Sequence, residues 1–223
     1  MPDGQYSFYL HSDDRTDIAA MATISTISQP LRGEFIRTAA TAGAVVYQVD
    51  ARLPALIPVF FAGQLSAVRL CAVMDLVSGT WSSLTGLPDE PENGGAALPV
   101  SPETEYQRRR YTLTLQNGRS GERVESVLTE ASSRLRGDLL RNLIITGLAL
   151  HTTAPELPRL LASMPVPPTS VSELQALVQQ MAGTADVNRA AAAVPDTPTA
   201  SAAPVSGSDT REIKKNMRRA FGD

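Results

Sequence analysis

The sequence has very little of the residues on which catalysis and disulfide chemistry depend. Among 223 residues there is one cysteine, Cys71, and there are two histidines, His11 and His151. A lone cysteine cannot form an internal disulfide, and neither histidine has a neighbour at metal-ligand spacing. The chain also has no glycine-rich phosphate loop. We therefore expect a protein that is not an enzyme, holds no cofactor or metal ion, and works in a reduced, cytoplasmic compartment.

Long hydrophobic runs and aromatic side chains are scarce as well. No apolar run reaches the roughly 18 residues that a membrane-spanning helix needs. The opening residues, 1–4, have neither the basic start nor the apolar stretch of a signal peptide. Aromatic residues make up 5% of the chain, against 43% for hydrophobic residues as a whole. This composition supports ordinary, mainly helical cores and no membrane partner.

Positive charge is scarce in some parts of the chain and concentrated in others. The formal net charge is −3, and both lysines, Lys214 and Lys215, lie in the last ten residues. Residues 1–100 contain five arginines against ten acidic residues, whereas residues 101–141 contain eight arginines against six. The distribution of charge matters more than its sum for an anionic partner. Nucleic acid therefore stays among the possible partners.

The sequence contains the same segment twice. Leu31-Arg32-Gly33-Glu34 reappears 104 residues later as Leu135-Arg136-Gly137-Asp138. The register then holds without a gap through Arg37 and Arg141, Gly43 and Gly147, Leu53-Pro54 and Leu157-Pro158, Leu56 and Leu160, Leu70 and Leu174, and Gly79 and Gly183. After a one-residue slip, residues 6–10 match residues 111–115. This match predicts two repeats of one small fold, over residues 1–79 and 106–183.

Each repeat begins with a predicted strand. Apolar and polar residues alternate over residues 6–11 and 111–116, which is the period of a half-buried strand. The inward faces would carry Tyr6, Phe8 and Leu10 in one repeat and Tyr111, Leu113 and Leu115 in the other. The outward faces would carry Ser7, Tyr9 and His11, and Thr112, Thr114 and Gln116.

Two helices are predicted after each strand. Asp14 and Ser120 are the expected caps of the first helix. In the second repeat its apolar stripe consists of Val124, Val127, Leu128, Ala131 and Leu135. The next helix carries a glycine in the middle of its apolar face, Gly43 or Gly147, at a cost of about 1 kcal/mol relative to alanine. Because the glycine is repeated, we expect another backbone to pack closely against it.

Two more helices complete each repeat. Pro54 and Pro158 suit the first turn of a third helix. The fourth helix is predicted from two matching apolar stripes, Leu70, Val73, Met74 and Val77, and Leu174, Leu177, Val178 and Met181.

The segments outside the repeats differ from them in composition. Residues 80–105 are rich in proline, glycine and acidic residues and read as a linker. Residues 184–208 contain almost no large apolar residue, which predicts a disordered tether. Residues 209–223 are predicted to form a short basic helix, with Ile213, Met217 and Phe221 at intervals of four. Such a helix is marginal alone in water, so we expect it to bind a partner, with a frayed, solubilising end as the alternative.

A strand followed by two helices in about 45 residues is the ribbon-helix-helix pattern. One short strand cannot satisfy its own backbone, and two such helices cannot bury their apolar stripes alone. Two copies solve both problems by pairing their strands and sharing a core. The expected fold is mainly α with short β-strands, in which tandem ribbon-helix-helix repeats pair within one chain as a pseudo-dimer or between chains.

A two-stranded ribbon fits the major groove of DNA, where its outward side chains contact base edges. The candidates for base contact are Ser7, Tyr9, His11, Thr112, Thr114 and Gln116. The backbone amides that open the second helix of each repeat, at Arg32-Gly33 and Arg136-Gly137, are placed to bind phosphate. Arg108, Arg109 and Arg110 come just before the second strand, within reach of the DNA backbone. The simpler alternative is a solvated strand face beside an exposed arginine run.

Residues 31–47, running into Asp50-Ala51-Arg52-Leu53-Pro54, resemble the core of ParR, the centromere-binding adaptor of actin-type plasmid partition, and residues 139–161 are similar. Glu212-Ile213-Lys214-Lys215-Asn216-Met217 resembles the end of ParR chains. The resemblance implies a cytoplasmic bacterial protein that binds repeated centromere sites on double-stranded plasmid DNA. It also implies side-by-side assembly into a ring or helical array. The tail residues Ile213, Lys214, Lys215, Asn216, Met217 and Phe221 would capture an actin-like, ParM-type filament.

The chain departs from that family in two respects. The family usually has one such unit per chain, so pairing within one chain would leave one tail for each DNA-binding unit. Asp13, Asp14 and Asp17 flank the first strand, which would then contact DNA poorly or serve only structurally. A ribbon-helix-helix repressor or an antitoxin whose tail neutralises a toxin is the alternative function.

Overall fold

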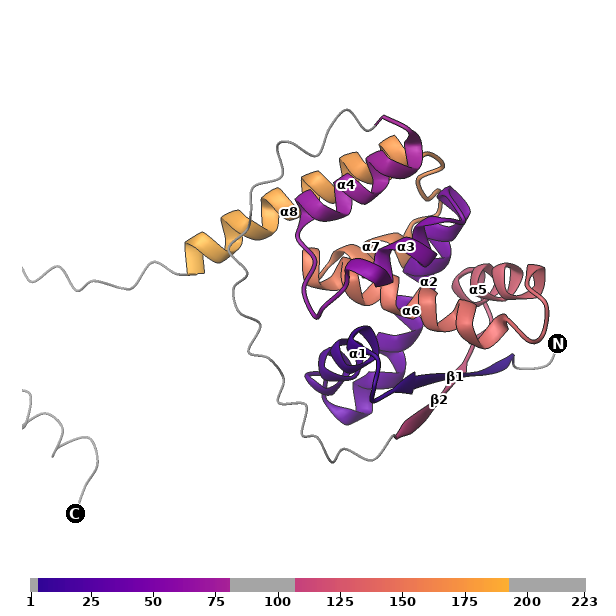
Figure 1. Cartoon of the computed structure of the whole chain (residues 1–223). Helices are drawn as coiled ribbons and strands as arrows, with labels where there is room; N and C mark the ends of the chain where they lie inside the picture. Colours follow the sequence, from indigo (N-terminus) through magenta and orange to yellow (C-terminus); the bar gives the residue numbers. More distant parts are fainter. Residues whose placement is uncertain (1–3, 81–106, 193–223) are drawn as a thin grey trace, which may run out of the picture. The chain divides into compact units, whose positions relative to one another are not determined.

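The computed structural model describes residues 4–80 and 107–192, with side chains described as far as Gly183. The residues described up to Asn188 belong to one compact unit. The elements of the described residues, in chain order, are β1 (Gln5–His11), α1 (Arg15–Ser25), a 3₁₀ turn (Gln29–Leu31), α2 (Arg32–Val49), α3 (Leu53–Phe60), α4 (Ala67–Ser78), β2 (Arg108–Thr114), α5 (Arg119–Glu130), α6 (Arg136–Thr153), α7 (Leu157–Ser163) and α8 (Val171–Ala192) (Figure 1).

Apart from the 3₁₀ turn (Gln29–Leu31), which the described residues show in the first repeat alone, the two repeats contain the same elements in the same order. Each has a strand followed by four helices, and α6 begins and ends 104 residues after α2. Leu53-Pro54 and Leu157-Pro158 open α3 and α7, with the proline in the first turn as predicted. The mainly helical fold class and the internal duplication are therefore confirmed.

The two strands pair with each other inside one chain. β1 runs antiparallel to β2, and Ser7 lies opposite Thr112 at the centre of the ribbon. Phe8, Leu10 and Leu113 point into the core and are almost fully buried. The ring of Phe8 stacks on that of Tyr111 with 5.2 Å between centroids. Of the two predicted modes of pairing, the structure has the pseudo-dimer.

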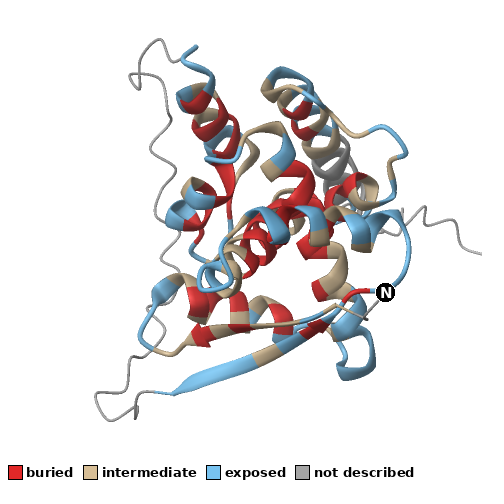
Figure 2. Cartoon of the chain, turned by 90° about the vertical axis from the view of Figure 1, so that its right-hand side faces the viewer, coloured by how far each residue is buried: buried red, intermediate tan, exposed pale blue. Residues whose placement is uncertain are grey.

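The helices α2 and α6 cross at the two glycines that the repeat singles out. A Cβ atom built on Gly43 would overlap the carbonyl oxygen of Leu143, and one built on Gly147 would overlap that of Ala39. The stretches Ala39–Val46 and Leu143–Leu150 are buried along their whole length. Apolar residues of both stretches belong to one core cluster, and Figure 2 shows the buried segments gathered in the interior of the unit. The predicted close backbone contact is confirmed, and each repeat supplies the other's partner.

The fourth helices are related in the same way. The Gln175 side-chain amide on α8 donates a hydrogen bond to Asp75 Oδ1 on α4 at 3.1 Å, and the Gln179 amide donates to Cys71 Sγ at 3.8 Å. Subtracting or adding 104 converts one pair into the other. The ribbon, the α2–α6 crossing and these hydrogen bonds thus share one pseudo-two-fold axis. Cys71 is a buried residue of α4, and burial raises the pKa of its thiol.

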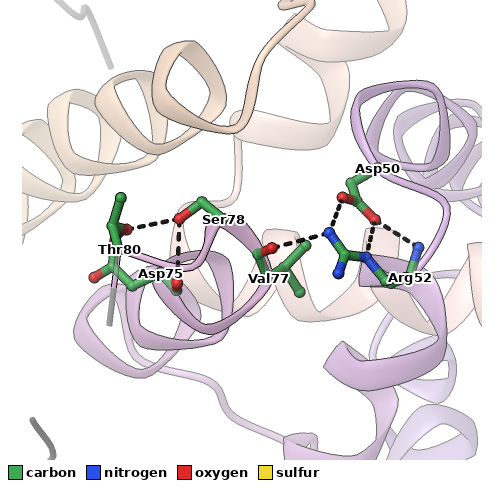
Figure 3. A network of polar contacts seen from close by, with 6 residues as sticks. All are labelled: Asp50, Arg52, Asp75, Val77, Ser78 and Thr80. Carbon is green, nitrogen blue, oxygen red and sulfur yellow. Dashed lines mark hydrogen bonds and ion pairs between the residues drawn. The ribbon is translucent and has the colours of Figure 1, made fainter. Parts of the chain in front are cut away.

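An arginine fastens the end of α4 in the first repeat. The Arg52 guanidinium donates to the carboxylate of Asp50 at 2.8 and 3.0 Å and to the Val77 carbonyl at 2.9 Å (Figure 3). A cation at the last carbonyls stabilises a helix end. Hydrogen bonding to Arg52 lowers the pKa of Asp50. The arrangement closes the turn after α2 onto the C-terminus of α4.

The matching helix of the second repeat ends differently. Ala154 and Glu156 stand where the first repeat has Asp50 and Arg52, so α8 has no such clamp. Gly79 ends α4 with φ 72°, whereas Gly183 lies inside α8, which continues to Ala192. The predicted tether therefore begins too early at 184, because the alanine-rich sequence favours helix even without large apolar residues.

Two details of α5 also differ from expectation. The helix begins after Gly118, and Ser120 is no cap, because its hydroxyl lies within the first turn and donates to the Ala162 carbonyl at 3.2 Å. Leu135 does not join the buried stripe, since α5 ends at Glu130 and Leu135 is 57% exposed. By contrast, Asp14 caps α1 as predicted and accepts from the Asp17 amide at 3.0 Å.

Within the described residues no helix is long and apolar enough to cross a membrane.

Three predicted segments lie wholly or largely outside the described residues. These are the linker, apart from Thr80, the predicted tether from residue 193 to 208, and the C-terminal helix of residues 209–223.

Replacing Gly43 by alanine is expected to lower the free energy of unfolding by about 3 kcal/mol, because the new methyl group must displace a backbone carbonyl of α6. Chemical denaturation followed by circular dichroism measures this. Gly183→Ala is the matched control, since a Cβ there meets no atom within 4 Å and should stabilise the helix by about 1 kcal/mol. Equal stability of Gly43→Ala and the wild type would contradict the close crossing.

Candidate nucleic-acid interface

The outer face of the ribbon brings together most of the predicted base-contacting residues. Gln5, Ser7, Tyr9 and His11 on β1 lie opposite Thr114, Thr112, Arg110 and Arg108 on β2. Directly opposed residues in an antiparallel pair point to the same face. Gln116 lies beyond the end of β2, and one more backbone bond, from the Leu115 amide to the Gly4 carbonyl, brings it to the edge of the ribbon.

The arginine triplet lies within the second strand and not before it. Arg108, Arg109 and Arg110 are the first three residues of β2, and they pair with His11, Leu10 and Tyr9. The sequence prediction began the strand at Tyr111, because three arginines do not alternate with apolar residues. Pairing with β1 extends the ladder through them, and β2 is consequently the more exposed strand (Figure 2).

Two of these arginines lie on the outer face and are held there by neighbours. The guanidinium carbon of Arg108 is 3.5 Å from the centroid of the Tyr9 ring. Arg110 donates from Nε and Nη2 to the hydroxyl of Ser7 at 3.2 and 3.0 Å. Stacking and a neutral acceptor hold a guanidinium in place without cancelling its charge. No ion pair recorded among the described residues involves either arginine.

Arg109 belongs to the inner face by its position in the strand, opposite Leu10, but it is exposed. Its guanidinium carbon is 5.2 Å from the centroid of the Tyr111 ring. It therefore adds an exposed positive charge to this end of the ribbon without belonging to the outer face.

The helices α2 and α6 start close to the ribbon. A Cβ built on Gly137 would be 3.4 Å from the carbonyl oxygen of Ser7, so the first turn of α6 lies against the centre of β1. Neither helix has a side-chain cap hydrogen bond, which leaves first-turn amides available to an anion. Glu34 and Asp138 in these first turns oppose such binding in part.

The side chains of Arg32 and Arg136 have a structural task. Arg32 donates from Nε to the Ile27 carbonyl at 2.8 Å, and Arg136 donates from Nε to the Ala131 carbonyl at 3.2 Å. Each guanidinium thus binds a carbonyl just after the preceding helix. The predicted contribution of these positions to DNA binding rests on the backbone at Gly33 and Gly137 and not on the guanidinium groups.

A buried ion pair that the sequence did not reveal closes one end of the ribbon. Asp17 is 0% exposed and accepts from the His11 amide at 2.9 Å and from Arg141 Nε at 2.7 Å. Asp14 lies 3.3 Å from Arg141 Nη2. Burial raises the pKa of Asp17, although these hydrogen bonds oppose the effect. Two of the three acidic residues that flank β1 are therefore paired with an arginine of the second repeat.

The other end of the ribbon lacks this ion pair. Gly118 and Gly121 stand where the first repeat has Asp14 and Asp17, so the matching arginine, Arg37, pairs instead with Glu34 on its own helix at 2.6 Å. Arg37 lines an open cleft of about 320 Å³ together with Arg119 and Arg159. The two ends of the ribbon therefore differ in charge although the backbone follows the same path.

Within residues 4–80 and 107–192, no group of three or more His, Cys, Asp or Glu side chains is placed to hold a metal ion. His151, at the end of α6, packs edge-on against Phe35 with 5.0 Å between ring centroids. The predicted partner-binding residues Ile213, Lys214, Lys215, Asn216, Met217 and Phe221 lie outside the described residues.

The fold places the chain in a class of proteins in which two ribbon-helix-helix repeats of different sequence are fused and pair within one chain. The family model for plasmid stability proteins matches the chain twice, over residues 4–74 and 109–178, and the chain belongs to that family. The two matches fall on the two repeats. No curated protein and no solved structure matches the chain.

Replacing Asp17 by asparagine is expected to change the pH dependence of stability. Because the folded-state pKa of Asp17 is raised above its ordinary value of 3.8, the unfolded chain loses this proton first as pH rises. The unfolding free energy of the wild type minus that of Asp17→Asn should therefore fall as pH increases through the interval above 3.8.

Denaturation at a series of pH values measures this difference, and the same series on Asp13→Asn corrects for the loss of one surface charge. A difference that increases with pH across that interval would contradict the burial of the Asp17 carboxyl.

Proposed function

We propose that this member of the plasmid stability family is a non-enzymatic DNA-binding adaptor for plasmid segregation. The ribbon enters the major groove of repeated, centromere-like sites on double-stranded DNA. The C-terminal segment captures an actin-like filament of the ParM type. Bound copies assemble side by side into a ring or helical array.

The outer face of the ribbon is the observation that carries this proposal. It presents Arg108 and Arg110, held by Tyr9 and Ser7, among hydroxyl and amide side chains. The major groove, about 12 Å wide, admits a two-stranded ribbon, and arginine is the commonest specific partner of guanine there. Threonine and glutamine complete the set of groups that contact base edges.

The intrachain pairing sets the number of tails. One chain supplies both strands of a ribbon, so each DNA-binding unit carries one C-terminal segment. Capture of a filament by several tails therefore requires several chains on neighbouring DNA sites. This requirement fits a centromere built from repeats, since linked weak contacts gain affinity from effective concentration.

The arginine on the outer face gives a direct test of DNA binding. A duplex selected by the wild-type protein from a random pool should bind Arg110→Ala about 10-fold to 100-fold more weakly, because one arginine–guanine contact accounts for about 1–3 kcal/mol. Fluorescence anisotropy over a range of salt measures the affinity and counts the phosphates engaged. Arg69→Ala, exposed on α4 at the opposite end of the unit from the ribbon (Figure 1), is the matched control. Equal affinity of both variants, or no selected duplex at all, would contradict the proposal.

Removal of residues 209–223 separates the two proposed activities. The shortened chain should bind the selected duplex as tightly as the full chain and should no longer co-sediment with filaments of the actin-like ATPase encoded beside it. The basic, apolar stripe of Ile213, Met217 and Phe221 is the proposed contact. Equal loss of both activities would count against the adaptor. If a small toxin is encoded there instead and binds the full chain but not the shortened one, the chain acts as a repressor or antitoxin.

A further inference from the structure

The pseudo-two-fold axis of the unit passes through the centre of the ribbon. Tyr6 lies opposite Leu113, and Phe8 lies opposite Tyr111, so the two pairs exchange when repeat positions are exchanged. Ser7 opposite Thr112 is the pair that maps onto itself. In a dimer of two identical chains, each side chain would recur on the far side of this axis, and the bound DNA site would be palindromic.

Residues at symmetry-equivalent positions are similar on the inner face of the ribbon and different on its outer face. Where the inner face packs against the core, equivalent positions are Tyr6 and Tyr111, Phe8 and Leu113, and Leu10 and Leu115, all of them apolar or aromatic. At the exposed end of this face, Arg109 has Gly4 as its counterpart. On the outer face, the equivalent positions are Gln5 and Arg110, Ser7 and Thr112, Tyr9 and Thr114, and His11 and Gln116. None of these four pairs is identical. The repeats have kept the side that builds the core and diverged on the side that faces outward.

Positive charge lies on one side of the axis. Arg110 pairs with Tyr9, and Arg108 pairs with His11, so both arginines of the outer face belong to the same half. Gln5 and Thr114 occupy the opposite half, which carries no charged side chain among the described residues of the outer face. The arginines are also fixed in place, by the Tyr9 ring and the Ser7 hydroxyl. The two halves thus offer different chemistry to a base edge.

The two helix starts that are proposed to bind phosphate have kept equivalent residues and equivalent hydrogen bonds. Gly33 and Gly137 are equivalent, and so are the arginines beside them, which bind equivalent carbonyls after α1 and α5. Phosphate contacts fix the position of a protein on DNA, whereas base contacts determine sequence preference. The unit would therefore dock as a symmetric dimer does but contact bases asymmetrically.

We propose that the ribbon recognises a DNA site without two-fold symmetry, composed of two different half-sites in a fixed order. The half-site beneath Arg108 and Arg110 contains guanine, because arginine donates to its O6 and N7 atoms. The half-site beneath Gln5 and Thr114 is richer in A·T pairs, since glutamine pairs with adenine and the threonine methyl contacts thymine. This inference rests on the proposed DNA-binding function and specifies its substrate.

The test uses the full chain and a duplex that it selects from a random pool. The selected sequence should lack inverted symmetry. Two further duplexes replace one half-site by the inverted copy of the other, so that each becomes a palindrome. The wild type should bind both palindromes at least about tenfold more weakly than the selected duplex, because mismatched base pairs lose their contacts.

Two substitutions should change this preference in opposite directions. Gln5→Arg places an arginine on both sides of the axis and should shift preference towards the palindrome of the guanine-containing half-site. Arg110→Gln removes the difference at the same pair of positions and should shift preference towards the other palindrome. Circular dichroism melting of both variants checks that the fold is retained.

The outcomes separate this inference from the proposed function. A selected duplex with inverted symmetry, bound as tightly as any other, would overturn the asymmetric site and leave DNA binding intact. Failure to select any duplex would overturn the proposed function itself. If the selected duplex is asymmetric but Gln5→Arg and Arg110→Gln prefer the same duplexes as the wild type, the assignment of the half-sites to these residues would also be overturned.

Discussion

The close crossing of α2 and α6 is the constraint on which the rest of the structure depends. Each helix approaches the other through a glycine, and the space that a Cβ would occupy holds a backbone carbonyl of the opposite repeat. Around the crossing, eight consecutive positions of each helix, Ala39–Val46 and Leu143–Leu150, are buried. A helix that is apolar on all sides needs neighbours on all sides. Neither repeat therefore encloses a complete core, and the ribbon and the α4–α8 hydrogen bonds follow the axis that this crossing sets.

Because the two repeats are fused in one chain, the two halves of the pseudo-dimer need not have the same sequence. In a dimer of identical chains a substitution changes both halves, whereas here each half changes alone. The Asp17–Arg141 ion pair illustrates this freedom, because Gly121 replaces Asp17 at the other end and leaves Arg37 to pair within its own helix. The ribbon follows the same pattern, with arginines on β2 and none on β1. A symmetric backbone thus carries an asymmetric surface.

Features with a local or periodic signal could be predicted from the sequence, and features created by pairing could not. Alternation gave the inward faces of both strands, and the repeated Gly43 and Gly147 gave the crossing. The start of β2 at Arg108 was missed because the three arginines do not alternate with apolar residues. Pairing with β1, and not a local pattern, makes them part of the strand. The contact between Asp17 and Arg141 joins residues 124 positions apart, and neither segment has a local sequence pattern that indicates it. The end of α8 was misplaced because the absence of large apolar residues after Gly183 indicated disorder, although alanine favours helix.

Native-state hydrogen exchange tests most directly whether the two repeats form one folding unit. Opening of either central helix would expose the apolar face of the other, so both must open together. The account predicts that the central amides of α2 and α6 exchange last, with the same free energy, equal to that of global unfolding. If the amides of one helix exchanged at a clearly lower free energy while those of the other remained protected, the repeats would have separate cores and the account would be wrong.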